Sequence, residues 1–243
     1  MDLGLSGRVA AITGATSGIG AACARALAQE GCEIVAADLR PAPAGQLPEG
    51  WLAVEADVAS ADGGRRVVDA ALERFGRLDV LVACAGIYET GALDDVDADR
   101  WDQVMAVNLR GTFLCAQAAI AAMRPRGWGR VITLASIAAR NGGRLAGPAY
   151  VASKAGVVGL TRSLAHAAGP HGITVNCVAP GVIDTPMTGV MGDAAKAQLA
   201  GGTPLRRNGR PEEVADVVAM LASERAGFVH GALVDVNGGL AMG

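Results

Sequence analysis

Aromatic side chains and histidines are scarce in this sequence of 243 residues, and the scarcity excludes several classes of function. Only 3% of the residues are aromatic and the net charge is −3, so the chain has neither the stacking groups nor the basic surface of a nucleic-acid-binding protein. Its three histidines show no metal-ligand spacing and its five cysteines include no C-x-x-C pair. We therefore expect no metal site.

Long apolar runs and targeting signals are also missing. No uninterrupted apolar run reaches the length of about 18 residues that a membrane span needs, so we expect no membrane association. The first residues, MDLGLSGR, lack the basic and apolar regions of a secretory signal. The odd number of scattered cysteines fits reduced, mostly buried thiols better than disulfides. Together these features predict a cytoplasmic protein.

Short apolar runs alternate with helical patterns along the whole chain. The predicted strands are residues 8–13, 33–37, 51–56, 78–83, 130–134, 173–178 and 232–236. The predicted helices are residues 19–30, 61–75, 99–123, 150–168 and 211–222. Strands that are apolar along their whole length are expected where helices cover both faces of a sheet. The fold class is therefore α/β: a Rossmann-like, doubly wound parallel sheet flanked by helices, in a single domain over residues 1–243.

One connection is unusually long for such a domain. Residues 185–210 contain glycine, proline and methionine and separate a predicted strand from a predicted helix. Long connections in compact domains are often functional, so we expect a substrate lid here; a mobile surface excursion is the alternative.

A glycine-rich segment, TGATSGIG at residues 13–20, lies between the first strand and the first helix. Gly14 permits a tight turn, Gly18 lets the backbone approach a pyrophosphate, and Gly20 allows close packing of helix and strand. The free N–H groups at the helix N-terminus then favour phosphate binding. By itself this pattern is only moderately specific, because glycines also end strands for steric reasons. The residues expected to line the phosphate site are Gly14, Thr16, Ser17, Gly18, Ile19 and Gly20.

Carboxylates at the ends of the second and third strands point to the nucleoside end of a dinucleotide. Asp38 is placed to accept hydrogen bonds from ribose hydroxyls and would repel the 2′-phosphate of NADP, so NAD is the expected cofactor. Arg40 keeps NADP as the less favoured alternative. Asp57 either meets the adenine amino group or caps the following helix. Leu39 and Val58, the neighbours of these carboxylates, complete the expected adenosine contacts.

With these motifs the chain resembles the short-chain dehydrogenase/reductase family in its single-domain form. It is especially similar to the branch that holds 3-oxoacyl-[acyl-carrier-protein] reductases and related secondary-alcohol dehydrogenases. The resemblance covers nearly the whole chain. It rests on motifs in one order: TGATSGIG, Asp57-Val58, Ala85-Gly86, Val107-Asn108-Leu109, Ser136, YVASK at 150–154, Pro180-Gly181 with Thr185, and Val236-Asn237-Gly238-Gly239.

One position departs from the family pattern. The family usually has asparagine before the Ala85-Gly86 pair, and this chain has Cys84. The departure puts the local rigidity of the adenine pocket in doubt and leaves the chemistry untouched. Cys84 is expected to be a small buried residue, because no activating base is evident beside it.

The resemblance implies a catalytic tetrad of Asn108, Ser136, Tyr150 and Lys154. Tyr150 would give a proton to a carbonyl oxygen during reduction and take it back during oxidation. Lys154 lies four residues later on the same helical face, and its ammonium is expected to lower the pKa of the phenol and to bind the nicotinamide ribose. Ser136 would orient the carbonyl, and Asn108 would hold a water that connects Lys154 to solvent.

The remaining contacts are expected at the carboxyl ends of the later strands. The cofactor contacts expected there, besides Tyr150 and Lys154, are Ala85, Gly86, Pro180, Gly181, Ile183 and Thr185. The expected substrate contacts are Ala138, Leu145, Val182 and Met187. These are apolar or small side chains, which suits a neutral ketone or secondary alcohol.

The family resemblance also bears on partners. A 3-oxoacyl-thioester reductase that uses NADPH is the alternative function, and an acyl carrier protein would then dock near Arg124, Arg126, Arg130 and His171. Asp38 fits that branch poorly, because its members commonly use NADPH. A homotetramer is expected, with the alanine-rich stretches 116–122 and 165–168 allowing close helix packing. A regulator that binds NAD without turning it over is disfavoured, because the chain keeps both Tyr150 and Lys154.

Overall fold

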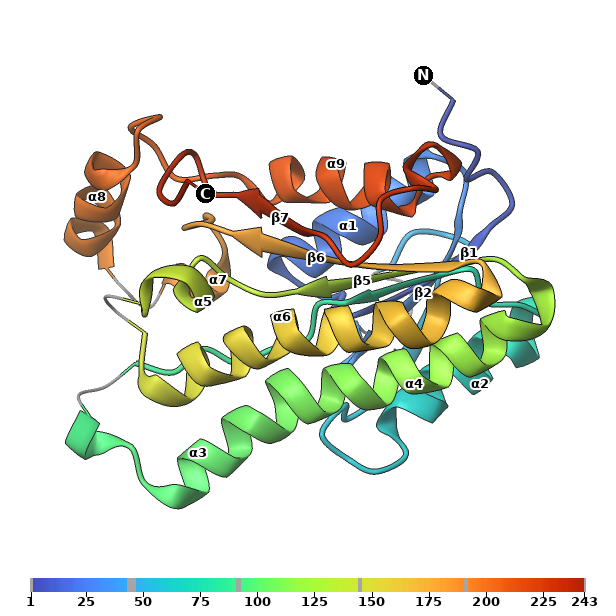
Figure 1. Cartoon of the computed structure of the whole chain (residues 1–243), viewed down its shortest axis with the longest axis horizontal. Helices are drawn as coiled ribbons and strands as arrows, with labels where there is room; N and C mark the ends of the chain where they lie inside the picture. The colour runs from blue at the N-terminus through green and yellow to red at the C-terminus, as the bar shows by residue number, and fades with distance from the viewer. Residues whose placement is uncertain (1, 43–46, 91–92, 144–145, 190–191, 243) are drawn as a thin grey trace.

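Seven parallel strands form one twisted sheet in the order β3-β2-β1-β4-β5-β6-β7 (Figure 1). They are β1 (Val9–Thr13), β2 (Glu33–Asp38), β3 (Leu52–Glu55), β4 (Val80–Ala83), β5 (Gly129–Leu134), β6 (Ile173–Pro180) and β7 (Leu233–Val236). The structure, a computed structural model, describes residues 2–42, 47–90, 93–143, 146–189 and 192–242. All seven predicted strands are confirmed. The strand order reverses between β1 and β4, which opens a crevice at their carboxyl ends.

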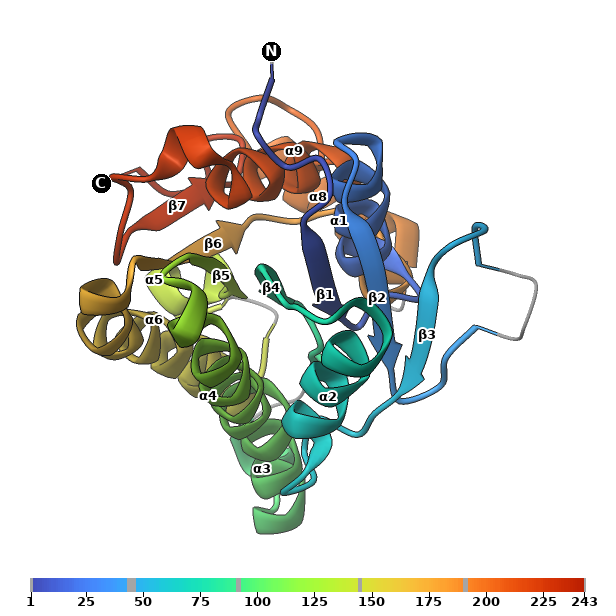
Figure 2. The same cartoon turned by 90° about the vertical axis from the view of Figure 1, so that its right-hand side faces the viewer.

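Helices cover both faces of the sheet, as Figure 2 shows end-on. One face carries α1 (Gly18–Gln29) and α9 (Pro211–Ala222), which pack against each other. The other face carries α2 (Gly63–Phe75), α4 (Thr112–Met123) and α6 (Pro148–Ala168). This is the doubly wound α/β arrangement that the sequence predicted.

The alternation of side chains along each strand divides the core in two. In β1, Ala10 and Ile12 belong to the cluster under α1 and α9, whereas Val9 and Ala11 belong to the cluster under α2 and α4. All five residues of this strand are buried. A strand buried on both faces has no polar side to show, which explains the continuous apolar run in the sequence.

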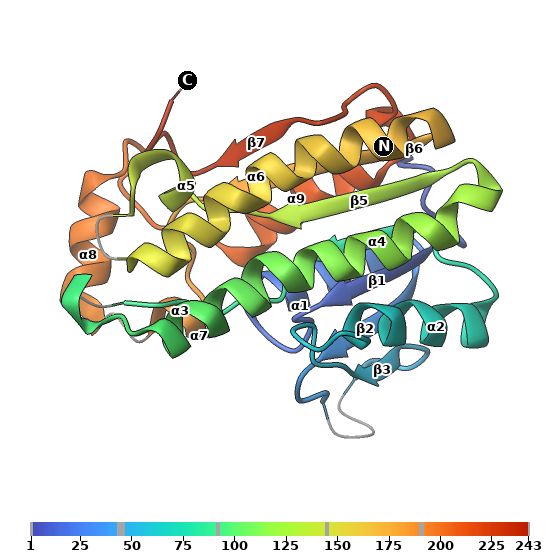
Figure 3. The same cartoon turned by 60° about the horizontal axis from the view of Figure 1, so that its bottom comes forward.

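The predicted helix 99–123 is interrupted. It consists of α3 (Ala98–Met105), a π-helical segment over Ala106–Gly111, and α4. The helical stretch Ala98–Arg126 is long and apolar enough to cross a membrane by length and composition alone. In this structure α4 lies beside α2, α6 and the strands β4 and β5 (Figure 3), which is the position of a core helix.

Short helices gather where the strands end, at the left in Figure 1. They are α5 (Ala138–Asn141), α7 (Pro186–Gly189) and α8 (Gly192–Gly202). The long connection 185–210 thus contains two helices that the sequence did not predict. Its action as a lid stays a prediction.

Candidate active site

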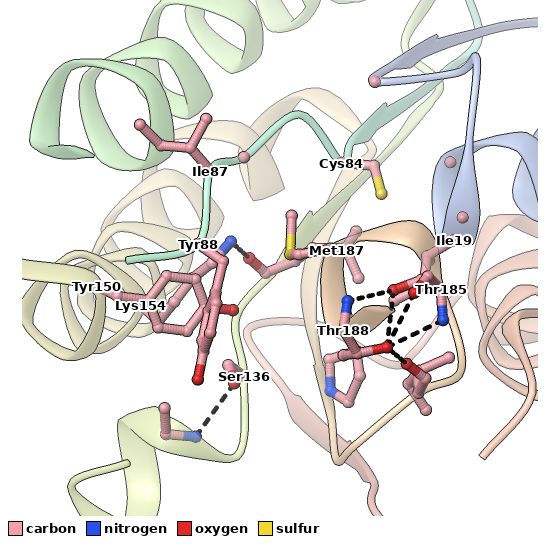
Figure 4. A pocket seen from close by; sticks show the side chains of 18 of the residues that line it. Ile19, Cys84, Ile87, Tyr88, Ser136, Tyr150, Lys154, Thr185, Met187 and Thr188 are labelled. Carbon is pink, nitrogen blue, oxygen red and sulfur yellow. Dashed lines mark hydrogen bonds between the residues drawn. The ribbon is translucent and has the colours of Figure 1, made fainter. Parts of the chain in front are cut away.

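A cavity of about 650 Å³ lies over the carboxyl ends of the strands. It extends from Asp38 at the end of β2 to Tyr150 on α6 and is bordered by the glycine turn. Figure 4 shows Tyr88, Ser136, Tyr150 and Lys154 gathered on one side and Ile19 with Thr185 on the other. One continuous space therefore joins the predicted nucleotide site to the predicted catalytic residues.

The glycine turn leaves the start of α1 open to an anion. Ser17 is the N-cap residue, but its side chain makes no capping hydrogen bond, and the first turn of α1 contains no acidic residue. Gly20 must be glycine, because a Cβ there would collide with the carbonyl oxygen of Gly14. The turn thus brings backbone N–H groups and the positive end of the helix dipole to the cavity.

The carboxylate of Asp38 is fixed at the other end of this space. Its Oδ2 accepts hydrogen bonds from the backbone N (3.2 Å) and Oγ1 (2.7 Å) of Thr16. Asp57 also lines the cavity, and its Oδ1 accepts a hydrogen bond of 2.9 Å from the backbone N of Ala59. Asp57 therefore closes the turn after β3 and does not cap the following helix, whose N-cap residue is Asp62. Its contact with the adenine amino group stays a prediction.

Tyr150 and Lys154 lie one turn apart in α6, and both are buried. The Lys154 Nζ donates a hydrogen bond of 2.8 Å to the carbonyl oxygen of Leu134 and lies 5.8 Å from the centre of the Tyr150 ring. Ser136 follows β5, and its Oγ accepts a hydrogen bond of 3.1 Å from the backbone N of Ala138. The structure brings three of the four predicted catalytic residues to the cavity wall.

Burial dominates the electrostatics of these groups. It raises the pKa of Tyr150 to about 12, and the hydrogen bond with Ser136 lowers it only in part. Burial also lowers the pKa of Lys154, because a desolvated ammonium loses its hydration. The pKa of Tyr150 is therefore raised overall, and the expected lowering of this pKa by Lys154 stays a prediction.

Asn108 does not line the cavity. Its side chain makes hydrogen bonds to the loop after β4 and to α6. In the π-helical segment, its Oδ1 accepts a hydrogen bond of 2.8 Å from the backbone N of Ile87. Its Nδ2 donates to the carbonyl oxygen of Ile87 (3.0 Å) and to the Oγ of Ser153 (3.1 Å). Asn108 thus connects the loop after β4 to α6, and its role in holding a water stays a prediction.

The other predicted site residues fall on the same cavity. Every residue predicted to bind the cofactor lines it, as do three of the predicted substrate contacts, Ala138, Val182 and Met187. Leu145 lies outside the described residues. The sequence missed several lining side chains: Ile137, Gln198, Leu199 and Leu240. Gln198 and Leu199 belong to α8, whose sequence carries no helical apolar stripe that would have revealed it.

Cys84 lies between the glycine turn and Lys154 on the cavity wall. Burial raises the pKa of its thiol to about 11, and the Lys154 charge only partly opposes this. A thiol that stays protonated is a poor nucleophile, which agrees with the expected lack of activation. Cys84 is only partly buried, however, and not buried as expected.

The two expected contact surfaces each contain buried members, although Arg124, Arg126 and His171 are exposed. Arg130 is only 4% exposed; its guanidinium lies 4.3 Å from the centre of the Trp128 ring and donates to the carbonyl oxygen of Ser223. It is therefore wrong as a docking residue for a carrier protein. The alanine-rich stretches are mixed, because Ala121 and Ala167 are exposed. The buried alanines among them are Ala116, Ala119, Ala165 and Ala168.

Comparison with known proteins extends this picture. The family model for enoyl-(acyl carrier protein) reductase matches residues 14–241. (3R)-3-hydroxyacyl-CoA dehydrogenase of Mus musculus is 42% identical over 99% of both chains. Cis-4-hydroxycyclohexanecarboxylate dehydrogenase of Sinomonas cyclohexanicum is 42% identical over 96% of both chains. The crystal structure of a short-chain type dehydrogenase/reductase from Mycobacterium marinum superposes with a TM-score of 0.94 at 32% identity, covering 100% of this chain and 98% of the other.

Proposed function

Because this chain belongs to the short-chain dehydrogenase/reductase family, an enzyme family acting on CH–OH groups, we propose that it transfers a hydride between NAD(H) and a ketone or secondary alcohol. One observation carries the proposal. Tyr150, Lys154 and Ser136 meet at one end of a cavity whose other end offers an uncapped helix N-terminus and a fixed carboxylate. The arrangement combines a dinucleotide site with a proton donor.

The residues present fit a nicotinamide dinucleotide, which when bound supplies or accepts the hydride. The N-terminus of α1 suits the pyrophosphate, because its N–H groups have no side-chain partner. The Asp38 carboxylate, held by Thr16, suits the hydroxyls of an unphosphorylated ribose. A 2′-phosphate would meet this negative charge, which supports NAD over NADP.

The chain's own residues move the proton. Tyr150 gives its hydroxyl proton to the substrate oxygen during reduction and takes it back during oxidation. The hydroxyl of Ser136 donates a hydrogen bond to the same oxygen and so fixes it beside the phenol. Because burial raises the pKa of Tyr150, the phenol is protonated at neutral pH. The protonated phenol is the form that gives its proton to the substrate oxygen during reduction.

The cavity wall around Tyr150 supports a neutral substrate. Ala138, Val182 and Met187 are apolar, and Lys154 is the only cation among the described lining residues. A 3-oxoacyl-thioester reductase that uses NADPH, with an acyl carrier protein as partner, is the second candidate. The likeness to a 3-hydroxyacyl-CoA dehydrogenase and to the acyl-carrier-protein reductase family model favours it, and Asp38 opposes its cofactor.

We also propose that the protein is cytoplasmic and that it assembles as a homotetramer. Phe113 on α4 and Phe228 ahead of β7 support the assembly, because both apolar rings are exposed in the single chain. Phe228 in particular is fully exposed beside the edge strand. Large exposed apolar groups of this kind are common where chains associate.

Steady-state rates test the function. Wild-type protein and Tyr150→Phe are assayed with NADH and NADPH, each against an acetoacetyl thioester and a panel of simple ketones. We expect turnover of a neutral ketone with NADH and a loss of at least about 100-fold in kcat for Tyr150→Phe, because the proton donor is gone. Strong preference for NADPH with thioester turnover would support the second candidate, and full activity of Tyr150→Phe would refute both.

A further inference from the structure

A buried carboxylate that the proposed chemistry does not use lies behind the catalytic helix. Glu89, in the loop after β4, is only 2% exposed and does not line the cavity. Its Oε2 accepts a hydrogen bond of 3.1 Å from the backbone N of Tyr150, 61 residues later in the chain. Its Oε1 is buried and has no hydrogen-bond partner among the described residues. Burying a carboxylate with half its acceptors unused is unfavourable, so the residue requires an explanation beyond packing.

The N-terminus of α6 explains the buried Glu89, because no side chain at the N-cap position of this helix makes a capping hydrogen bond. Its N-cap residue is Gly147, which has no side chain, and Pro148 has no N–H to satisfy. A side chain on Gly147 would collide with the carboxylate of Glu89, so the space where a local cap would lie is already filled by Glu89. The backbone N of Gly147 also donates a hydrogen bond of 2.9 Å to the carbonyl oxygen of Glu89.

Glu89 therefore acts as a cap delivered from another part of the chain. A carboxylate at a helix N-terminus satisfies a free N–H group and interacts favourably with the helix dipole. In this helix the capped N–H belongs to Tyr150 itself. The cap thus fixes the backbone of the residue whose phenol must face the substrate.

The loop that carries Glu89 is itself held firmly. The side chain of Asn108 bonds both backbone groups of Ile87. The carbonyl oxygen of Tyr88 accepts a hydrogen bond of 3.3 Å from the Nη2 of Arg100. The Tyr88 ring meets the Tyr150 ring edge-on, with their centres 5.0 Å apart. Consecutive residues of one anchored loop thus contact the ring and the backbone of Tyr150.

From these contacts we propose that Glu89 is a positioning residue for Tyr150: it fixes the first turn of α6 so that the phenol is aimed at the substrate oxygen. The proposal rests on the proposed function, because it assigns Tyr150 the proton transfer. Loss of Glu89 should lower kcat and leave cofactor binding unchanged, since Glu89 lies outside the cavity. A small displacement of a reacting group is known to reduce rates by as much as about 100-fold.

The test compares Glu89→Ala, Glu89→Gln and the control Asp79→Asn. Asp79 is a similarly buried carboxylate just ahead of β4, at the amino ends of the strands and so at the far end from the cavity. We expect Glu89→Ala to lower kcat about 10- to 100-fold, with the KM for NADH changed less than about twofold. Glu89→Gln should recover activity to within about threefold of wild type, because the amide oxygen still accepts the Tyr150 N–H. Asp79→Asn should lower stability and leave kcat unchanged.

Hydrogen exchange gives a readout that does not depend on activity. Backbone amides of residues 148–154 should exchange faster in Glu89→Ala than in wild type and should be unchanged in Asp79→Asn. Faster exchange with an unchanged kcat would overturn the proposal, as would a loss of kcat that Glu89→Gln fails to recover. Full activity of Tyr150→Phe would instead refute the proposed function, and the exchange result would still report whether Glu89 caps α6.

Discussion

The ionisation of Tyr150 can be measured almost in isolation, because the chain contains only two tyrosines. The substitution Tyr88→Phe leaves Tyr150 as the only phenol and keeps an aromatic ring against it. Burial raises the pKa of Tyr150 to about 12. Relative to an ordinary phenol with a pKa of about 10, this corresponds to about 2.7 kcal/mol of added free energy for the phenolate.

The assay follows phenolate absorbance of the cofactor-free Tyr88→Phe protein as the pH is raised. We expect no ionisation through the neutral range and none below about pH 11. The variant Lys154→Met in the same background should titrate within about half a pH unit of it, since desolvation of the phenol sets its pKa. Circular dichroism at each pH confirms that the fold persists during the titration.

The same burial makes stability depend on pH at the alkaline end. Below about pH 10 the phenol is protonated in both folded and unfolded chains, and its contribution is fully present. As the pH rises towards about 12, the unfolded chain releases the proton first and stability falls by up to about 2.7 kcal/mol. A phenolate that forms below about pH 9 in the cofactor-free protein would refute the reasoning, because it would show that the cation prevails over burial.

Two further substitutions test other parts of the structure. Asp79→Asn weakens an ion pair between the buried Asp79 and the partly exposed Arg77. Asp79 accepts hydrogen bonds of 2.7 and 2.6 Å from Arg77 and one of 2.9 Å from the backbone N of Val9. We expect the free energy of unfolding to fall by about 3 kcal/mol, because these hydrogen bonds involve a charged group. Calorimetry should then show a Tm lower by roughly 6–12 °C, and an unchanged Tm would contradict this. Asp38→Ala removes the carboxylate held by Thr16 and should raise the KM for NAD about 10- to 100-fold. The same substitution should also reduce the difference between the KM for NAD and the KM for NADP. An unchanged ratio of these two KM values would contradict the role of Asp38 in selecting NAD over NADP.

Much of the fold could be predicted because the pattern of apolar residues in each segment matches the burial of that segment in the structure. A continuous apolar run such as VAAIT in β1 predicts a strand that is buried on both faces of the sheet. The spacing of Tyr150 and Lys154 likewise determines that they share a face of α6. These features depend on sequence periodicity alone.

Other features depend on contacts between distant parts of the chain. The sequence of the π-helical segment 106–111, AVNLRG, contains no proline that would mark an interruption of the predicted helix. The helix α8 is short, rich in alanine and glycine, and lacks an apolar stripe. Glu89 is an unremarkable loop residue until the fold brings it to Tyr150. The raised pKa of Tyr150 follows from burial, which no spacing reveals.

The π-helical segment also determines how α3 and α4 are aimed relative to one another. Each residue of an α-helix advances the direction of its side chain by about 100° around the axis. Val104 before the segment, Asn108 within it and Cys115 after it are all buried, so the inward-facing side of the helix continues through the interruption. Deleting a single residue would rotate α4 by about 100° relative to α3. Either the Asn108 side chain that bonds Ile87 or the buried side of α4 would then face water. The number of residues between α3 and α4 is thus fixed by the need for both helices to keep the same side buried.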